Sequence, residues 1–219
     1  MIKKKIFLIF SFLLSSSCQG NQGIIKNEFK NSPPKKISYL NKEKAYFASG
    51  CFWCVEAIYE SVYGVEEVFS GYAGGNTNNP TYNSIGTGQT GHAESVEVIY
   101  DPLKVSFKTL VNVFFGSHDP TSINRQGPDV GSQYRSIAFF TNKEEQEIIN
   151  KKIDSLTKNK TYQKPIATEV RKIKKFYYAE DYHQDYEKLN PNNPYVRNIS
   201  VPRLNKFKSK FKNILKETH

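Results

Sequence analysis

The chain has 219 residues, a net charge of +10 and 38% hydrophobic residues, enough for the core of one domain with extensions. Residues 1–44 carry a net +7 and residues 203–219 a net +5, which leaves a net −2 for residues 45–202. Because the central part is nearly neutral, the charge argues against a dedicated DNA- or RNA-binding surface. The basic ends could instead rest against anionic lipid headgroups.

The N-terminus has the pattern of an export signal. Lysines at 3–5 precede an apolar run, 6–14, which is too short to span a bilayer. Three serines at 15–17 then lead to Cys18, and a Cys after small residues resembles the lipobox of bacterial lipoproteins, in which that Cys carries the lipid. Ser15 stands where Leu is usual, so ordinary signal-peptide cleavage is the alternative.

We expect four segments along the chain. Residues 1–18 form a lipoprotein-type signal, and residues 19–43, which show no periodicity, a flexible tether. Residues 44–202 form one folded domain, and residues 203–219 a basic, solvated tail or frayed helix without chemistry. The mature protein is expected to be exported. It is then either a membrane-anchored lipoprotein of the bacterial cell envelope, facing the periplasm, or a free periplasmic protein.

Strand-like and helix-like segments alternate through the domain. The expected strands are 45–48, 65–72, 93–100, 134–140 and 166–173. The expected helices are 51–62, 105–115, 179–189, and one that Thr141 caps with Glu144 in the capping-box position and that ends near Lys160. Two long loops, 76–92 and 118–133, are of the length that is usually functional in a compact domain. This pattern predicts an α/β (α+β) domain with an antiparallel-leaning mixed sheet.

Gly50-Cys51-Phe52-Trp53-Cys54 lies between the first strand and the first helix. Unpaired N–H groups at a helix N-terminus favour a thiolate at Cys51, and Gly50 would let another molecule's backbone approach closely. By itself the motif is as typical of buried structural cysteines, or of half a zinc site, as of a redox pair. If Cys18 is lipidated, only two thiols remain, and the four histidines show no paired metal-ligand spacing. We therefore expect a redox pair and no metal.

The two long loops add groups that this chemistry needs. Glu94 opens a strand in which it alternates with Val96 and Val98, so it can face the apolar side of the sheet. There its pKa would rise and it could donate a proton. Tyr82 lies in the first loop, and Tyr134 ends the second. Each alone is more typical of a packed or solvated residue, but together with a thiolate they are a competent set for breaking an S–O bond.

Several motifs occur in one consistent order over about residues 44–195. They are Gly50-Cys-Phe-Trp-Cys54, Gly71-Tyr-Ala-Gly-Gly75, Gly91-His-Ala-Glu94, Tyr100-Asp-Pro102, His118-Asp-Pro-Thr121, Asn124-Arg-Gln-Gly-Pro-Asp-Val-Gly-Ser-Gln-Tyr-Arg135 and Phe176-Tyr-Tyr-Ala-Glu-Asp-Tyr-His-Gln184. In these motifs the chain resembles peptide methionine sulfoxide reductase of type A. The resemblance implies a two-layer sandwich with a split β-α-β, ferredoxin-like core. It also implies peptide-methionine (S)-S-oxide reductase activity, which is one of the two epimer-specific repair activities for oxidised methionine.

The resemblance also implies a function for each matching residue. Cys51 would attack the sulfoxide sulfur, while Glu94, assisted by the hydroxyls of Tyr82 and Tyr134, would protonate the oxygen. The substrate-binding residues would be Phe52 and Trp53 for the S-methyl group, Asp129 for the substrate backbone, and His183 with Tyr186 less directly.

Cys54 departs from the commonest form of the family motif, which has Gly there, and the tail after Pro202 has no resolving cysteine. We therefore expect Cys54 to resolve the Cys51 sulfenic acid as a disulfide. The expected reductant is thioredoxin or a related dithiol, with no cofactor, and the expected substrates are free methionine sulfoxide and oxidised proteins. We expect a monomer that binds no nucleic acid. The alternatives are a general thiol–disulfide oxidoreductase that uses the C-x-x-C pair and a non-enzymatic binding module.

Overall fold

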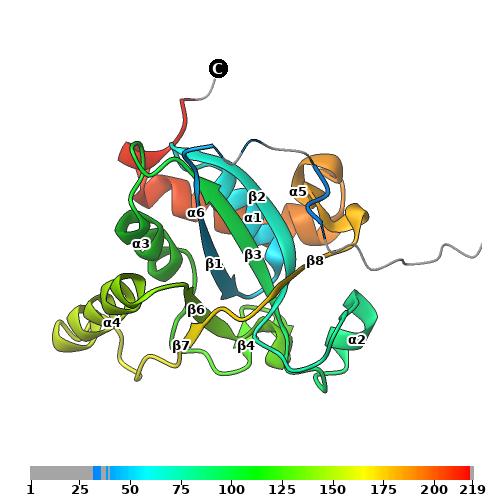
Figure 1. The fold of residues 1–219 in the computed structure, drawn as a ribbon, viewed down its shortest axis with the longest axis horizontal. Helices are drawn as coiled ribbons and strands as arrows, with labels where there is room; N and C mark the ends of the chain where they lie inside the picture. The colour runs from blue at the N-terminus through cyan, green and yellow to red at the C-terminus, as the bar shows by residue number, and fades with distance from the viewer. Residues whose placement is uncertain (1–31, 36–37, 39, 218–219) are drawn as a thin grey trace, which may run out of the picture.

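The computed structural model describes residues 32–35, 38 and 40–217 (Figure 1). The predicted signal segment with Cys18, and the predicted tether up to residue 31, lie outside these residues. None of the helices in the described part of the chain combines the length and the apolar character that crossing a membrane requires.

Six strands form one mixed sheet in the order β7-β6-β1-β3-β2-β8. Their bounds are β1 Glu43–Ser49, β2 Val65–Ala73, β3 Ala93–Tyr100, β6 Ser136–Phe140, β7 Glu169–Lys172 and β8 Phe176–Tyr178. All neighbours pair antiparallel except β6 and β7, which are parallel. The strand expected at 166–173 is present as the shorter β7, and β8 was not predicted from the sequence.

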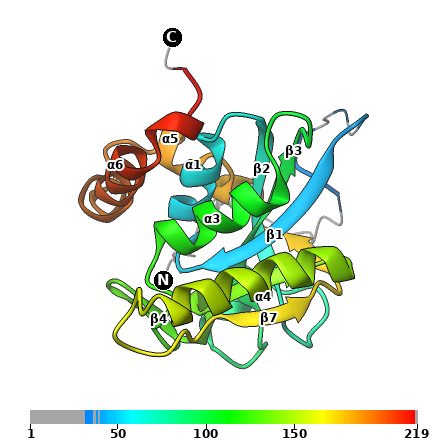
Figure 2. The ribbon, with the colours of Figure 1, turned by 90° about the vertical axis from the view of Figure 1, so that its left-hand side faces the viewer.

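Three of the four longer helices pack against this sheet, α1 Phe52–Glu60, α3 Phe107–Ser117 and α4 Lys143–Lys158, and the fourth, α6 Val201–Lys210, packs on α1 and α3. The connection β1-α1-β2 leaves room for β3 between its two parallel strands, and β3-α3-β6 leaves room for β1. These are two interlocked split β-α-β units, which confirms the predicted fold class. Figure 2 shows α3 and α4 side by side over the sheet, with α6 beyond α1.

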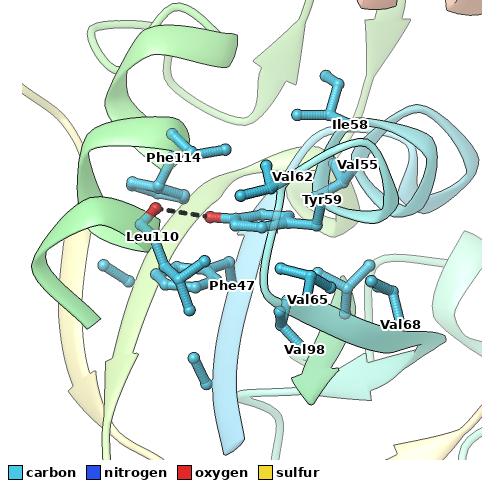
Figure 3. Close-up of a cluster of buried hydrophobic side chains, with 14 of the residues drawn as sticks. Phe47, Val55, Ile58, Tyr59, Val62, Val65, Val68, Val98, Leu110 and Phe114 are labelled. Atoms are coloured by element: carbon cyan, nitrogen blue, oxygen red, sulfur yellow. Dashed lines mark hydrogen bonds between the residues drawn. The ribbon is translucent and has the colours of Figure 1, made fainter. Parts of the chain in front are cut away.

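The main core lies between the sheet and these helices (Figure 3). Phe47 of β1 stacks on Tyr59 of α1 with ring centroids 5.1 Å apart, and the Tyr59 hydroxyl donates to the Leu110 carbonyl at 3.1 Å. All three side chains are fully buried. Burying each such side chain contributes about 1.5–3 kcal/mol, so this contact fixes α1 and α3 against β1. The position of Cys51 at the start of α1 depends on that anchorage.

The predicted loops contain short elements. Loop 76–92 includes the helix α2, Tyr82–Gly86, which Thr81 caps by accepting from the Ser84 N–H at 3.2 Å. Loop 118–133 includes a two-stranded ribbon of β4, Arg125–Gln126, and β5, Asp129–Val130. Both elements were too short to show a periodicity in the sequence.

The predicted cap of α4 is wrong by one residue. Asn142 is the N-cap, and its side chain accepts from the Glu145 N–H at 3.0 Å. Glu145 in turn accepts from the Thr141 N–H at 2.6 Å, so Glu145 has the function that the capping box assigned to Glu144.

The predicted helix over 179–189 is also wrong. The chain forms a 3-10 turn at Asp181–His183, then turns at Asp185, whose φ is +52°, before the short helix α5, Tyr186–Leu189. The left-handed residue breaks the helix, because an L-residue in that conformation cannot continue a right-handed turn. This break lets His183 point into the domain, where its side chain is buried.

The prediction of a solvated tail over 203–219 is wrong for most of its length. Helix α6 packs on α1 and α3, and Phe207 is fully buried. Leu204 and Phe211 pack against the same core. These residues have the spacing of an apolar helical stripe, which the surrounding lysines concealed. The predicted domain boundary after residue 202 therefore falls inside α6.

Candidate active site

The turn between β1 and α1 presents Cys51 at the N-cap of the helix, as predicted. Gly50 adopts φ = +91°, a conformation that L-residues rarely adopt. A Cβ atom on Gly50 would lie 2.7 Å from the Gln126 Cβ atom. The close approach that Gly50 permits is therefore made by this chain's own Gln126. The expectation that Gly50 leaves space for another molecule's backbone is wrong.

Glu94 lies directly behind this turn. It shares the helix-covered side of β3 with Val96 and Val98, and it is 2% exposed. Its Oε2 atom accepts from the Phe52 N–H at 2.9 Å, which ties the carboxyl group to the residue after Cys51. Burial raises the pKa of Glu94 to about 8, and the charges of Asp129 and Cys54 add to the effect. Glu94 is therefore predominantly protonated at neutral pH, as its apolar surroundings predicted.

Two phenols lie beside this carboxyl group. Tyr82 begins α2, and Tyr134 ends a 3-10 turn, Ser132–Tyr134. Burial, followed by the charges of Glu94 and Cys51, raises the pKa of Tyr82 to about 12. Burial and the charge of Glu94 raise the pKa of Tyr134 as well. Both side chains are half-buried and keep their hydroxyl protons at neutral pH.

The two thiols are free and buried. Cys51 is 5% exposed and Cys54 1% exposed, so Cys51 is the more accessible of the two residues. The Cys51 thiol hydrogen-bonds to Cys54, and this bond, followed by the charge of Arg203, lowers the pKa of Cys54 to about 6. Burial, the same bond and the charge of Glu94 raise the pKa of Cys51. In the resting pair the thiolate therefore resides on Cys54, and the expectation that the helix N-terminus holds a thiolate at Cys51 is wrong, because burial and the neighbouring Glu94 oppose it.

An aromatic wall borders the thiols on the side of α1. Trp53 stacks on Tyr186 with ring centroids 3.7 Å apart, and its Nε1–H donates to His183 Nδ1 at 3.2 Å. Phe52 lies within 6.2 Å of the Tyr82 ring, centroid to centroid. Burial lowers the pKa of His183 to about 4, so the imidazole is neutral and can accept from Trp53. The wall is mostly apolar, and the Nε2 atom of His183 is a buried polar atom in it without a hydrogen-bond partner among the described residues.

Tyr195 lies edge-on against Trp53 and connects the wall to Asp129 and Cys54. The Tyr195 hydroxyl donates to Asp129 Oδ2 at 2.6 Å and lies 3.9 Å from the Cys54 sulfur. Burial raises the pKa of Asp129, while the hydrogen bond from Tyr195 and the charge of Arg203 lower it. Tyr195 thereby connects the predicted substrate-binding carboxyl group to the second thiol.

The structure brings all the predicted site residues of the domain into one cluster. They are Cys51, Phe52, Trp53, Cys54, Tyr82, Glu94, Asp129, Tyr134, His183 and Tyr186. Tyr195 and Arg203 were not predicted as site residues. The proline- and asparagine-rich run at 190–194 marks a turn before Tyr195, and this was the one sequence signal that pointed there.

An acidic group elsewhere in the described part of the chain has a metal-like spacing. Ligand atoms of Glu60, Glu67 and Asp185 lie within 4.8 Å of one another. Lys188 Nζ is 2.9 Å from Glu60, and Lys35 Nζ is 2.6 Å from Asp185. Because lysines already neutralise these carboxylates, the group is explained as a surface ion-pair network that also holds the described part of the predicted tether.

A model of the peptide methionine sulfoxide reductase family matches residues 43–215, from the start of β1 to beyond α6. The chain belongs to this family. A peptide methionine sulfoxide reductase of Trichodesmium erythraeum is 51% identical over 162 residues, which cover 74% of this chain and 92% of that protein. Another from Synechocystis is 42% identical over 207 residues, which cover 94% of this chain and 95% of that protein.

Solved structures of the reductase family share the fold. The structure of Mxr1 from Saccharomyces cerevisiae in reduced form is 32% identical, with a TM-score of 0.66, and the match covers 76% of this chain and 92% of that one. Methionine sulfoxide reductase A of Corynebacterium diphtheriae is 37% identical, with a TM-score of 0.63, and covers 69% of this chain and 76% of that one. The family resemblance noted in the sequence motifs is confirmed. The matches also place α6 inside the reductase domain.

Proposed function

We propose that this reductase converts the S-sulfoxide of methionine, free or within oxidised proteins, to methionine at the Cys51 sulfur. The observation that carries the proposal is the buried carboxyl group of Glu94, which is held on the Phe52 N–H next to Cys51 and has a pKa of about 8. A protonated acid beside a thiol is what breaking an S–O bond requires, because the oxygen must be protonated as the sulfur is attacked.

In the first step the Cys51 sulfur attacks the sulfoxide sulfur, and the proton shared between the two thiols passes to Cys54. Glu94 gives its proton to the sulfoxide oxygen, and the hydroxyls of Tyr82 and Tyr134 hydrogen-bond the same oxygen. The protonated oxygen then moves from the substrate sulfur to the Cys51 sulfur as the bond between the two sulfurs breaks, so methionine leaves as the thioether and Cys51 becomes a sulfenic acid. The site needs no cofactor for this chemistry, since the oxidising equivalents end on sulfur.

The aromatic wall supplies the substrate pocket. Phe52 and Trp53 would contact the S-methyl group, with His183 and Tyr186 fixing the indole behind them. Asp129, on the two-stranded ribbon, would accept a hydrogen bond from the substrate backbone. An apolar pocket that ends in a protonated carboxyl group favours a neutral, polarised S–O group over a charged side chain.

Cys54 then resolves the sulfenic acid as a Cys51–Cys54 disulfide. This is supported by the hydrogen bond between the two thiols and by the absence of any other cysteine in the described residues. A thioredoxin-like dithiol is the proposed reductant. It would attack the sulfur of Cys51, the more exposed of the two cysteine residues. With every site residue supplied by one chain, we propose that the monomer is active.

We also propose that the protein acts outside the cytoplasm, anchored by lipid on Cys18 or released after signal cleavage. The support is the charged, apolar and small-residue order of residues 1–18. Fractionation of cells that express the full chain and a Cys18→Ala variant separates these states. A lipoprotein moves from the membrane to the soluble fraction on substitution, whereas full-length protein in the cytoplasm contradicts export.

Mass spectrometry of the purified protein after one exposure to the S-sulfoxide of a methionine peptide tests the reaction. We expect one methionine formed per protein and a Cys51–Cys54 disulfide. The R-sulfoxide serves as the control and should remain unreduced. A disulfide that forms without any methionine would contradict the proposal and favour a general thiol–disulfide oxidoreductase.

A further inference from the structure

Arg203, in the stretch predicted to be a solvated tail, is fixed against the catalytic turn. Its Nη2 atom donates to the Ser49 carbonyl at 2.9 Å and its Nε atom to the Ser117 carbonyl at 3.0 Å. Its Nη1 atom lies 3.4 Å from where a Cβ atom on Gly50 would be. The guanidinium group of Arg203, which belongs to α6, therefore lies against the backbone of Ser49 and Gly50, directly before Cys51.

Among the described residues this cation has no ion-pair partner, and its charge acts over a longer distance on Asp129. In the described residues the arginines that form ion pairs are Arg135 and Arg171, and no carboxylate lies within ion-pair distance of Arg203. Two carbonyl acceptors fix the guanidinium group but leave its full positive charge. A half-buried cation without a counter-ion stabilises any anion that forms nearby.

The anion that forms nearby is the Cys54 thiolate. Helix α6 packs on α1, and among the charged groups around Cys54 the charge of Arg203 is the one that lowers its pKa. The remaining titratable groups near Cys54 are Cys51 on the same helix, Tyr195 from the C-terminal segment, Glu94 from β3 and, behind Tyr195, Asp129 from β5. All of these are neutral or negative, so none of them can replace the arginine.

The cation becomes more important after the first step. Once Cys51 is a sulfenic acid it no longer has the thiol proton that hydrogen-bonds Cys54 in the resting enzyme. We propose that Arg203 is a positioning residue for resolution: from the turn that carries Cys51, its charge holds Cys54 as the thiolate that attacks the sulfenic acid. This inference rests on the proposed resolving function of Cys54.

The step balances without another reactant. Cys54 releases the proton that it took up in the first step, and its thiolate attacks the Cys51 sulfur. The S–S bond forms as the S–O bond breaks, and hydroxide leaves with that proton as water. The sulfenic sulfur is reduced and the Cys54 sulfur is oxidised, so the disulfide keeps the two oxidising equivalents that came from the sulfoxide.

Single-turnover kinetics of Arg203→Gln, which keeps N–H donors but loses the charge, test the proposal. Quenched samples report methionine formation and, after alkylation, the disulfide. At pH values where Cys54 is ionised in both proteins, we expect methionine to form at the wild-type rate within about twofold, because the Cys54 thiolate can then take up the Cys51 proton in either protein. The pH midpoint of disulfide formation should rise by about one unit or more. Arg203→Lys should move the midpoint back, and Lys206→Met, the same loss of charge at an exposed site on α6, should leave it unchanged.

Equal slowing of both steps in Arg203→Gln with an unmoved midpoint would mean that Arg203 only holds α6 in place. That result overturns the proposal. A Cys51→Ser protein, in which Cys54 is titrated alone by its thiol reactivity, keeps the proposal testable if Arg203→Gln does not fold. We expect a Cys54 pKa below the ordinary value of about 8.5, and a value at or above it contradicts the proposal. If Cys54→Ser instead cycles at the wild-type rate with the dithiol, Cys54 is not the resolver, and the failure lies with the proposed function rather than with Arg203.

Discussion

The two sides of the thiol pair differ in where their residues come from and in how visible they were in the sequence. The acid side consists of Glu94, Tyr82 and Tyr134, which strand β3 and the two long loops hold near Cys51. The resolving side consists of Cys54, Tyr195 and Arg203, of which the last two come from the C-terminal segment. The acid side keeps its groups protonated, while the resolving side stabilises an anion.

This difference follows from the chemistry of the two half-reactions. Breaking the S–O bond needs a proton donor in a dry site, and burial alone supplies one by raising the pKa of Glu94. Forming the disulfide needs a thiolate, which burial opposes, so a hydrogen bond and a cation must compensate. The two neighbouring sulfurs therefore differ in protonation, because Glu94 beside Cys51 favours the thiol and Arg203 near Cys54 favours the thiolate.

The largest expected effect is on the acid side. Glu94→Gln keeps the volume and can still accept from the Phe52 N–H, but it has no acidic proton. We expect methionine formation in a single turnover to slow by about 10²–10⁴-fold. Glu66→Gln, at the exposed edge of β2, is the matched control and should be unaffected. A Glu94→Gln protein with full single-turnover activity would remove Glu94 as the acid.

On the resolving side, Cys54→Ser should complete one turnover and then stop with a thioredoxin-like dithiol. The reason is that the Cys51 sulfenic acid has no internal thiol to attack it. Steady-state turnover with the dithiol and the yield of methionine per protein measure this separately. Continued cycling at the wild-type rate would show that the dithiol attacks the sulfenic acid itself.

The pH dependence separates the two sides. With a pKa of about 8, Glu94 loses its proton as the pH rises through 8, so methionine formation in a single turnover should fall there. The same shift affects stability. The pKa of Glu94 is higher in the folded state than in the unfolded state, where it is about 4.3. The contribution of protonated Glu94 to the free energy of unfolding is therefore fully present below about pH 4.3 and is lost as the pH rises through the folded-state pKa.

Glu94→Gln should therefore remove part of this loss of stability. Chemical denaturation of both proteins at a series of pH values measures the difference in their free energy of unfolding. We expect this difference to move in favour of Glu94→Gln between the two pKa values. Parallel curves would contradict a raised pKa.

The smallest expected effect is that of Tyr195→Phe. It removes the hydroxyl that lies between Asp129 and the Cys54 sulfur, and leaves the ring against Trp53. The loss of one hydrogen bond corresponds to about 0.5–1.5 kcal/mol, so disulfide formation should slow by about two- to tenfold. Methionine formation should change less than disulfide formation. A larger effect on the first step would place Tyr195 on the acid side.

The acid side was predictable because its residues lie in contiguous motifs. Cys51 follows a strand and precedes a helix, and Glu94 alternates with valines, so strand and helix periodicities place both at one end of the sheet. The fold class followed from the same alternation. Gly50 was interpreted wrongly because its positive φ and its contact with Gln126 depend on a loop 76 residues away in sequence, which no local pattern encodes.

The resolving side was missed for a different reason. Backbone carbonyls of Ser49 and Ser117 hold the Arg203 side chain in place, and the Asp129 carboxyl group on β5 holds the Tyr195 hydroxyl. Such contacts between distant segments leave no periodicity in either one. The lysines of α6 also gave it the composition of a solvated tail, although Phe207 lies in the core.

The central claim is that Glu94 is protonated beside Cys51, and an NMR titration of ¹³C-labelled glutamate carboxyl groups tests it most directly. The signal that is absent from Glu94→Gln identifies the residue, and its chemical shift against pH gives the pKa. We predict a midpoint of about 8, set by burial. A midpoint near the ordinary value of about 4.3 would mean that Glu94 is ionised at neutral pH and cannot supply the proton.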